Sequence, residues 1–179
     1  FPYKKMKFTA KILKTINVLL IIGMLISLFL LYEHFSPSAS KFCTFGKSLD
    51  CGIVNQSPYA NLDGISYLLT IYFALPIPLA NIADINPFFN LITSNAFLGF
   101  LTLLFLFFLV KANYEDKKFL FINKSKTLNW LKGITLFGVI YGFYLFLVQE
   151  FILKTYCIFC IALDIVLLAL LIIVWTIKK

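Results

Sequence analysis

The sequence predicts an all-α integral membrane protein, in which residues 1–179 form a single domain built as a bundle of four transmembrane helices. Hydrophobic residues make up 61% of the chain and charged residues only 13%, whereas a soluble domain carries about a quarter charged residues. Several apolar runs approach the ~20 residues that a helix needs to cross a bilayer. All 16 basic residues are lysines, and most stand at the ends of these runs. This distribution indicates membrane lipid as a partner and excludes a nucleic-acid groove.

The first expected span covers about residues 16–31. Five lysines precede this apolar run, and Glu33 and His34 end it. Because positively charged flanking segments stay in the cytoplasm, we expect the N-terminus there. The chain then emerges on the outer side of the membrane near His34.

Residues 35–94 are expected to form an extracytoplasmic loop and cap. The stretch up to Ser57 is polar and contains Cys43 and Cys51. Ser57 has the residue type of a helix N-cap, and Pro58 after it suits the first helical position. Residues 65–83 are apolar but short and interrupted by two prolines, and residues 84–94 have the composition of a turn-rich connection. We expect both stretches to lie over the outer mouth of the bundle.

Three further spans are expected at about residues 95–110, 130–151 and 157–177. If residues 65–83 do not cross the membrane, both lysine-rich termini and the lysine-rich loop at 111–132 are cytoplasmic, and only Lys41, Lys47 and Lys154 lie outside. If they do cross, that loop moves outside and the two cysteine pairs lie on opposite faces. The lysine distribution favours four spans, with both termini in the cytoplasm and both cysteine pairs outside it.

The chain has four cysteines, and the last two form a Cys-x-x-Cys motif that opens the last span. A helix that begins near Tyr156 places Cys157 and Cys160 one turn apart on one face. Cys157 then lies in the first turn, where free N–H groups and the helix dipole stabilise a thiolate. Cys43 and Cys51 lie in a loop that contains two glycines and can move. A mobile pair beside a membrane-embedded pair can pass two electrons inward by disulfide exchange.

Two other uses of the cysteines remain open. Cys43 and Cys51 could form a structural disulfide beside an inert Cys157–Cys160 pair. Four cysteines could also bind zinc, but the wide spacing of the loop pair and its place at the membrane edge argue against a metal, so we expect none.

The order of these motifs resembles the vitamin K epoxide reductase family. Cys43, Cys51 and Ser57 come first, then the cap, then a span that opens with residues 94–99 (SNAFLG), and finally the motif at residues 157–160 (CIFC). The DsbB-type quinone reductases carry their cysteine pairs in the opposite order. The resemblance covers about residues 43–164 and implies a four-helix bundle that encloses a quinone at its outer end under the loop and cap. It indicates a microbial-type member without a fused thioredoxin domain.

The resemblance also implies roles for single residues. Cys43 resembles the outer thiol that exchanges with a reduced partner, and Cys51 the relay that attacks or bonds with Cys157. Cys160 resembles the thiolate nearest the quinone. Ser57 matches the family's loop Ser/Thr, for which an N-cap is the simpler reading. Asn95 matches the Asn that hydrogen-bonds a quinone oxygen, for which a cap beside Ser94 is the alternative.

Asp164 departs from the vertebrate members, which carry a Tyr at this place. It lies four residues after Cys160, so the two share a helix face. An ionisable group within a span suggests a functional site because its burial is costly. Asp164 could carry a proton, hydrogen-bond the quinone, or pair with a polar group on a neighbouring helix.

These inferences lead to a quinone-dependent thiol–disulfide oxidoreductase that supports disulfide formation in exported proteins. Electrons pass from a separate thioredoxin-like (DsbA-like) protein through both cysteine pairs to a quinone, which could be ubiquinone, menaquinone or vitamin K. The composition suggests a microbial cell membrane. Two alternatives are a reductase of vitamin K epoxide or vitamin K quinone, and a non-enzymatic ligand-binding membrane protein that is stapled by disulfides.

Overall fold

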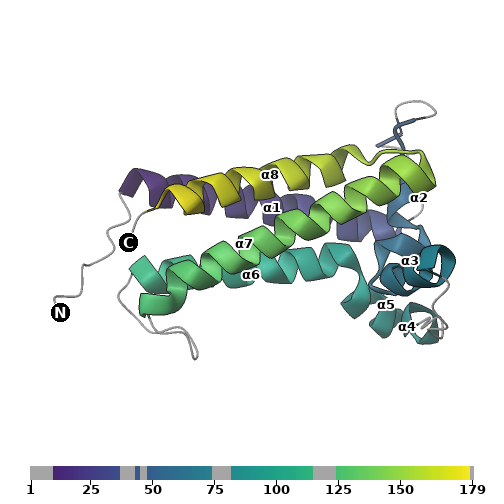
Figure 1. The fold of residues 1–179 in the computed structure, drawn as a ribbon, viewed down its shortest axis with the longest axis horizontal. Helices are drawn as coiled ribbons and strands as arrows, with labels where there is room; N and C mark the ends of the chain where they lie inside the picture. Colours follow the sequence, from purple (N-terminus) through teal and green to yellow (C-terminus); the bar gives the residue numbers. More distant parts are fainter. Residues whose placement is uncertain (1–9, 37–42, 45–47, 74–81, 115–123, 178–179) are drawn as a thin grey trace.

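Four long helices form the bundle in the computed structural model, which describes residues 10–36, 43–44, 48–73, 82–114 and 124–177. They are α1 (Ala10–Phe35), α6 (Asn95–Tyr114), α7 (Lys124–Leu147) and α8 (Ile158–Thr176). Each is long and apolar enough to cross a membrane. The chain enters and leaves at one end of the bundle, and the short helices gather at the other (Figure 1). The predicted fold class is therefore confirmed. α1 runs beyond both predicted ends of its span and α6 beyond the later one, α7 begins and ends earlier than predicted, and α8 is one residue shorter at each end.

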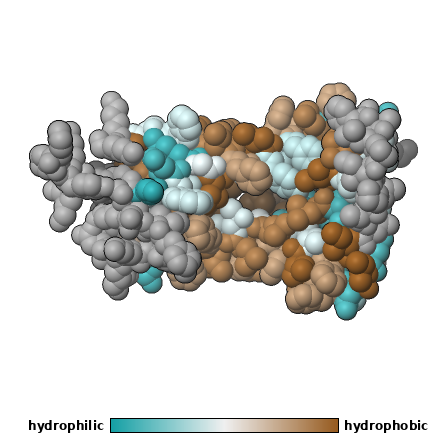
Figure 2. Space-filling view, turned by 60° about the horizontal axis from the view of Figure 1, so that its bottom comes forward, coloured by the Kyte–Doolittle hydropathy of each residue, from teal (hydrophilic) through white to brown (hydrophobic). Residues whose placement is uncertain are grey.

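The interior of the bundle is apolar. α1 packs against α6 and α8, and α7 packs mainly against α8. Leucine, isoleucine and valine side chains from all four helices fill the centre, among them Ile16, Leu20, Leu106, Leu128 and Leu170. Figure 2 shows hydrophobic side chains over much of the middle of one outer face as well. A helix that is apolar on all sides suits a bundle whose exterior contacts lipid.

The cap consists of five short helical segments. These are α2 (Cys51–Asn55), the 3-10 turn η2 (Pro58–Ala60), α3 (Asp63–Phe73), α4 (Ile82–Ile85) and α5 (Pro87–Thr93). At 11 residues, α3 is far shorter than the ~20 residues of a span. Pro76 and Pro78 lie outside the described residues.

Residues 84–94 were expected to form a turn-rich connection, and this expectation is wrong. Asn86 is the N-cap of α5, and its side chain accepts a hydrogen bond from the Phe88 backbone N–H at 3.0 Å. Pro87 stands at the first helical position. The Asn-Pro pair is therefore a helix start signal here and not a turn signal.

The last turns of α7 change into the π-helical segment η3 (Val148–Leu153). Lys154 then ends this segment with φ of 51°, in the left-handed region that non-glycine residues seldom adopt. The turn sends the chain back toward α8 over only a few residues. Such π-helical turns often occur at functional sites, and this one directly precedes the Cys-x-x-Cys motif.

Candidate active site

The loop cysteines form a buried disulfide. Cys43 is bonded to Cys51, with their Cα atoms 5.5 Å apart, and both residues are fully buried. A bridge between Thr44 and Asp50 closes this loop. Asp50 also caps α2, because its carboxylate accepts a hydrogen bond from the Ile53 N–H at 3.1 Å. Gly46 lies outside the described residues, and Gly52 is buried within α2, so Gly52 does not act as an exposed hinge.

The second pair lies at the start of α8. Cys157 is disulfide-bonded to Cys160, with their Cα atoms 5.2 Å apart. Cys157 was expected in the first turn of the helix, but it is the N-cap, and its Sγ accepts a hydrogen bond from the Cys160 N–H at 3.1 Å. The free N–H groups of the helix start therefore still point toward the sulfur. Cys157 is fully buried, whereas Cys160 is half-buried.

The two pairs are held side by side by backbone hydrogen bonds. The Asp50 N–H donates to the Tyr156 carbonyl at 3.1 Å, and the Tyr156 N–H donates to the Ser48 carbonyl at 3.0 Å. Cys51 and Cys157 each directly follow one of these bonded residues and belong to one buried apolar cluster. The Tyr156 hydroxyl, which is exposed, donates to Glu150, and this bond raises the pKa of Tyr156. The arrangement has the proximity that disulfide exchange between the pairs requires.

Gln149 is a site residue that the sequence did not reveal. It is 2% exposed, and its side-chain oxygen accepts a hydrogen bond from the Cys157 N–H at 2.7 Å. Its backbone carbonyl accepts a further bond from the Thr155 N–H at 3.3 Å. Gln149 therefore fixes the segment that carries Cys157. In the sequence, Gln149 is only a single polar residue near the end of an apolar run. This pattern does not indicate which group it bonds.

One cavity brings together residues from distant parts of the chain. It lies between the cap and the ends of α6, α7 and α8. Four residues singled out from the sequence line it, namely Ser57, Asn95, Cys160 and Asp164. Most of the remaining wall is apolar, and its members are Leu30, Val54, Ala60, Ala96, Leu145, Val148, Leu153 and Leu163.

Asn95 is the polar centre of this cavity. Its amide donates to the Tyr59 carbonyl at 2.9 Å, and its side-chain oxygen accepts from the Tyr141 hydroxyl at 2.7 Å. Ser94 instead caps α6, because its hydroxyl oxygen accepts a bond from the Phe97 N–H at 3.3 Å. The cap reading of Asn95 is thus wrong. A primary amide has two N–H donors, so one remains for a ligand.

Ser57 and Asp164 differ in how they are bonded. The Ser57 hydroxyl donates to the Val54 carbonyl at 2.8 Å and makes no capping bond, although Ser57 holds the N-cap position of η2. Asp164 is half-buried and has no hydrogen-bond or ion-pair partner within the described part of the chain. Gly142 gives it room, because a Cβ there would overlap the carboxyl group. The expected alternative of a polar partner on a neighbouring helix is not found among these residues.

The cavity has the chemistry that a quinone ring requires. Such ligands take apolar walls with a few directed polar groups. Here most of the wall is aliphatic. Among the described residues, Asn95 retains an N–H donor and Asp164 presents a carboxyl group without a partner. Cys160 lines the same space. The residues present therefore fit a quinone.

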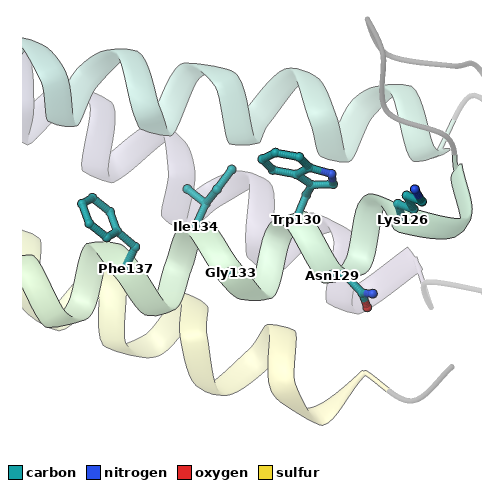
Figure 3. A pocket seen from close by; sticks show the side chains of 6 residues that line it. All are labelled: Lys126, Asn129, Trp130, Gly133, Ile134 and Phe137. Carbon is teal, nitrogen blue, oxygen red and sulfur yellow. The ribbon is translucent and has the colours of Figure 1, made fainter.

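A second hollow lies on α7 at the opposite end of the bundle. Figure 3 shows Trp130, Ile134 and Phe137 along one side of it, with Lys126 near the start of the helix. Its lining within the described part of the chain contains neither a thiol nor a carboxyl group. It therefore offers no redox chemistry that competes with the cavity at Cys160.

Comparison with protein families gives a match over most of the chain. A model described as "Vitamin K epoxide reductase family" matches residues 14–175. The match covers all four long helices and both cysteine pairs. No curated protein matches the chain.

Proposed function

The chain belongs to the vitamin K epoxide reductase family, and on this premise we propose that it is a quinone-dependent thiol–disulfide oxidoreductase. Membership supports an oxidoreductase in a membrane. The proposal adds the direction of electron flow, which runs from a separate thioredoxin-like protein to Cys43–Cys51, and then to Cys157–Cys160. Its outcome is disulfide formation in exported proteins.

One observation carries this proposal. Cys160 lines a largely apolar cavity together with Asn95 and Asp164, while its partner Cys157 lies in the buried cluster that contains Cys43 and Cys51. The second pair therefore faces the loop pair with one sulfur and the cavity with the other. This is the geometry of a two-step relay, in which each exchange needs contact only with the next group.

The residues of the chain have distinct tasks in this relay. The Cys51 thiolate attacks the Cys157 sulfur, and the electron pair of the broken bond leaves on Cys160. Gln149 holds the Cys157 backbone during the exchange. A bound quinone supplies an acceptor for two electrons and two protons. Asn95 orients such a ring with its remaining N–H donor, and Asp164 is the titratable group beside it that can hold a proton.

We further propose that the end with the cap is extracytoplasmic and that both termini are cytoplasmic, in a microbial cell membrane. The lysines of the termini and of residues 111–132 then lie inside. An oxidising compartment at the cap keeps the cysteine pairs oxidised between turnovers.

The test measures oxidation of a reduced DsbA-like protein by the purified chain in detergent. Ubiquinone, menaquinone and vitamin K epoxide are compared side by side as acceptors. We expect turnover with a quinone and its loss in Cys160→Ala. Turnover with the epoxide alone would favour the vitamin K epoxide reductase, and an unchanged rate in Cys160→Ala would exclude the relay. If the disulfides are only structural, Cys160→Ala should still bind the quinone. Neither this variant nor the unaltered protein should then show turnover.

A further inference from the structure

Glu33 is a buried carboxyl group beside the loop disulfide. It lies in the last turn of α1, and its side chain is fully buried, with 0% exposed. One of its carboxylate oxygens and the Sγ atoms of Cys43 and Cys51 all lie within 4.8 Å of one another. Carboxylates are seldom fully buried unless they are paired.

The hydrogen bonds of Glu33 do not account for its burial. Oε2 accepts one long bond, from the Asn55 amide at 3.4 Å, and the same amide also donates to the Leu30 carbonyl at 3.2 Å. Oε1 is buried and has no partner among the described residues. An unsatisfied buried polar atom costs about 1–3 kcal/mol. A purely structural glutamate is thus a poor solution, since a neutral side chain would serve Asn55 as well.

Among the described residues, no charged group neutralises Glu33. The next residue, His34, directs both ring nitrogens elsewhere, to the Asn55 carbonyl at 2.5 Å and to the Asn90 side-chain oxygen at 2.8 Å. From the loop, Asp50 is close enough to repel a second negative charge. From α2, the side chain that contacts Glu33 is the neutral Asn55. The buried apolar cluster of the loop disulfide also contains Cys157. Lys41 and Lys47 lie outside the described residues.

We propose that Glu33 is the proton donor and acceptor of the loop pair, an assignment that rests on the proposed function. When a partner thiolate attacks Cys43, its sulfur bonds to the Cys43 sulfur and the Cys43–Cys51 bond breaks. The electron pair leaves on Cys51, which takes the proton of the Glu33 carboxyl group. The second thiolate of the partner then attacks the mixed disulfide, so the partner is oxidised and Cys43 is released.

The same carboxylate serves the second half of the relay. Glu33 takes the proton back from the Cys51 thiol, and the resulting thiolate attacks Cys157. The Cys157–Cys160 bond breaks, and its electron pair leaves on Cys160. Cys43 then displaces Cys157 from Cys51, which restores the loop disulfide. Glu33, Cys43 and Cys51 are all buried. Solvent is therefore poorly placed to exchange these protons.

The test isolates the loop pair in the full-length chain that carries Cys157→Ser and Cys160→Ser. Reduction of Cys43–Cys51 by dithiothreitol is followed by acid quench, alkylation and mass measurement, with Glu33 or with Glu33→Gln. Glutamine keeps an oxygen acceptor for Asn55 but holds no acidic proton. Asp84→Asn is the matched control, because Asp84 is an exposed carboxyl group of the cap at the same end of the bundle.

We expect Glu33→Gln to slow the reduction by about a hundredfold at low pH, the scale of general acid catalysis. The ratio of the two rates should fall toward one as pH rises, because the carboxyl group then loses its proton and the original advantage disappears. Asp84→Asn should leave the rate unchanged at every pH. A ratio that is constant with pH, whatever its size, would overturn the assignment, because a structural role has no such dependence.

Glu33→Asp covers the case in which Glu33→Gln does not fold. A retained pH dependence with a displaced midpoint supports the proton role, and a profile identical to that of Glu33 contradicts it. The assay contains no quinone and no protein partner. It therefore separates a failure of the Glu33 assignment from a failure of the proposed function, which would appear as absent quinone turnover with the pH-dependent ratio intact.

Discussion

At the scale of single residues, Asn95 joins three parts of the structure. It lies at the start of α6, donates to the cap through the Tyr59 carbonyl, and accepts from Tyr141 on α7. The sequence showed an amide at the start of a span but could not show which of its atoms were in use. That depends on the cap and on α7, which are distant in the chain.

Asn95→Ala should raise the KM for quinone about tenfold, the equivalent of ~1.4 kcal/mol. The variant loses the free N–H donor and releases the Tyr59 carbonyl. Steady-state rates at varied quinone concentration measure the effect. The control is Asn129→Ala, which replaces an exposed asparagine near the start of α7, at the end of the bundle away from the cap. An unchanged KM in Asn95→Ala would show that this amide does not contact the quinone.

Gln149→Leu should lower the free energy of unfolding by about 1–3 kcal/mol, because the buried Cys157 N–H loses its acceptor. A shift of the melting temperature in detergent measures this change. Gln149→Glu keeps an acceptor oxygen and should lose less. Gln56→Leu replaces an exposed glutamine of the cap and serves as control. Equal melting temperatures for Gln149→Leu and this control would contradict the role of Gln149.

At the scale of elements, His34 connects α1 to the cap. Its two ring nitrogens lie at 2.5 Å from the Asn55 carbonyl of α2 and at 2.8 Å from the Asn90 side-chain oxygen of α5. The sequence indicates no function for His34 at the end of its span. In the structure, its imidazole connects two cap helices to the bundle. An interfacial histidine in a sequence gives no sign of partners 21 and 56 residues away.

His34→Ala should speed hydrogen exchange in α2 and α5, because both helices lose a buried or half-buried bond to α1. The amides of the central turns of α6 and α8 should exchange as before, since the core there does not involve the cap. Tyr32→Ala, an exposed residue of the same helix, is the control. Uniformly faster exchange in all helices would mean that His34 supports the whole bundle and not the cap in particular.

The capping of helices explains where the sequence prediction succeeded and where it was wrong. Long apolar runs with lysines at their ends predicted α1, α6, α7 and α8, because hydropathy over ~20 residues is a strong signal. Short cap helices carry no comparable signal, so α5 was taken for a turn although Asn86 and Pro87 begin it. The N-cap position of Cys157 was missed by one residue, since cap geometry depends on the bond that the Cys157 N–H donates to Gln149.

At the scale of the whole molecule, all the candidate chemistry lies at one end of the bundle. The cap, both disulfides and the cavity gather there, and both chain ends lie at the other (Figure 1). The order of motifs along the chain predicted this grouping, but the fit of Cys160, Asn95 and Asp164 around one cavity depends on how the helices pack.

The proposed orientation predicts which side of the membrane exposes the cysteines. In right-side-out vesicles that have been treated with reductant, a membrane-impermeant maleimide added outside should label Cys43 or Cys51. A cysteine placed at Lys179 should be labelled only after the membrane is permeabilised. Labelling of the loop pair solely in permeabilised vesicles would contradict the four-span orientation.

The central claim is that the loop pair passes electrons directly to the second pair, and a trapped intermediate tests it most directly. Cys43→Ala combined with Cys160→Ala leaves only Cys51 and Cys157. After mild oxidation, mass measurement under non-reducing conditions should find these two residues joined in a disulfide within one chain. If both are recovered as free thiols, or are joined only between chains, the two pairs do not meet and the relay is wrong.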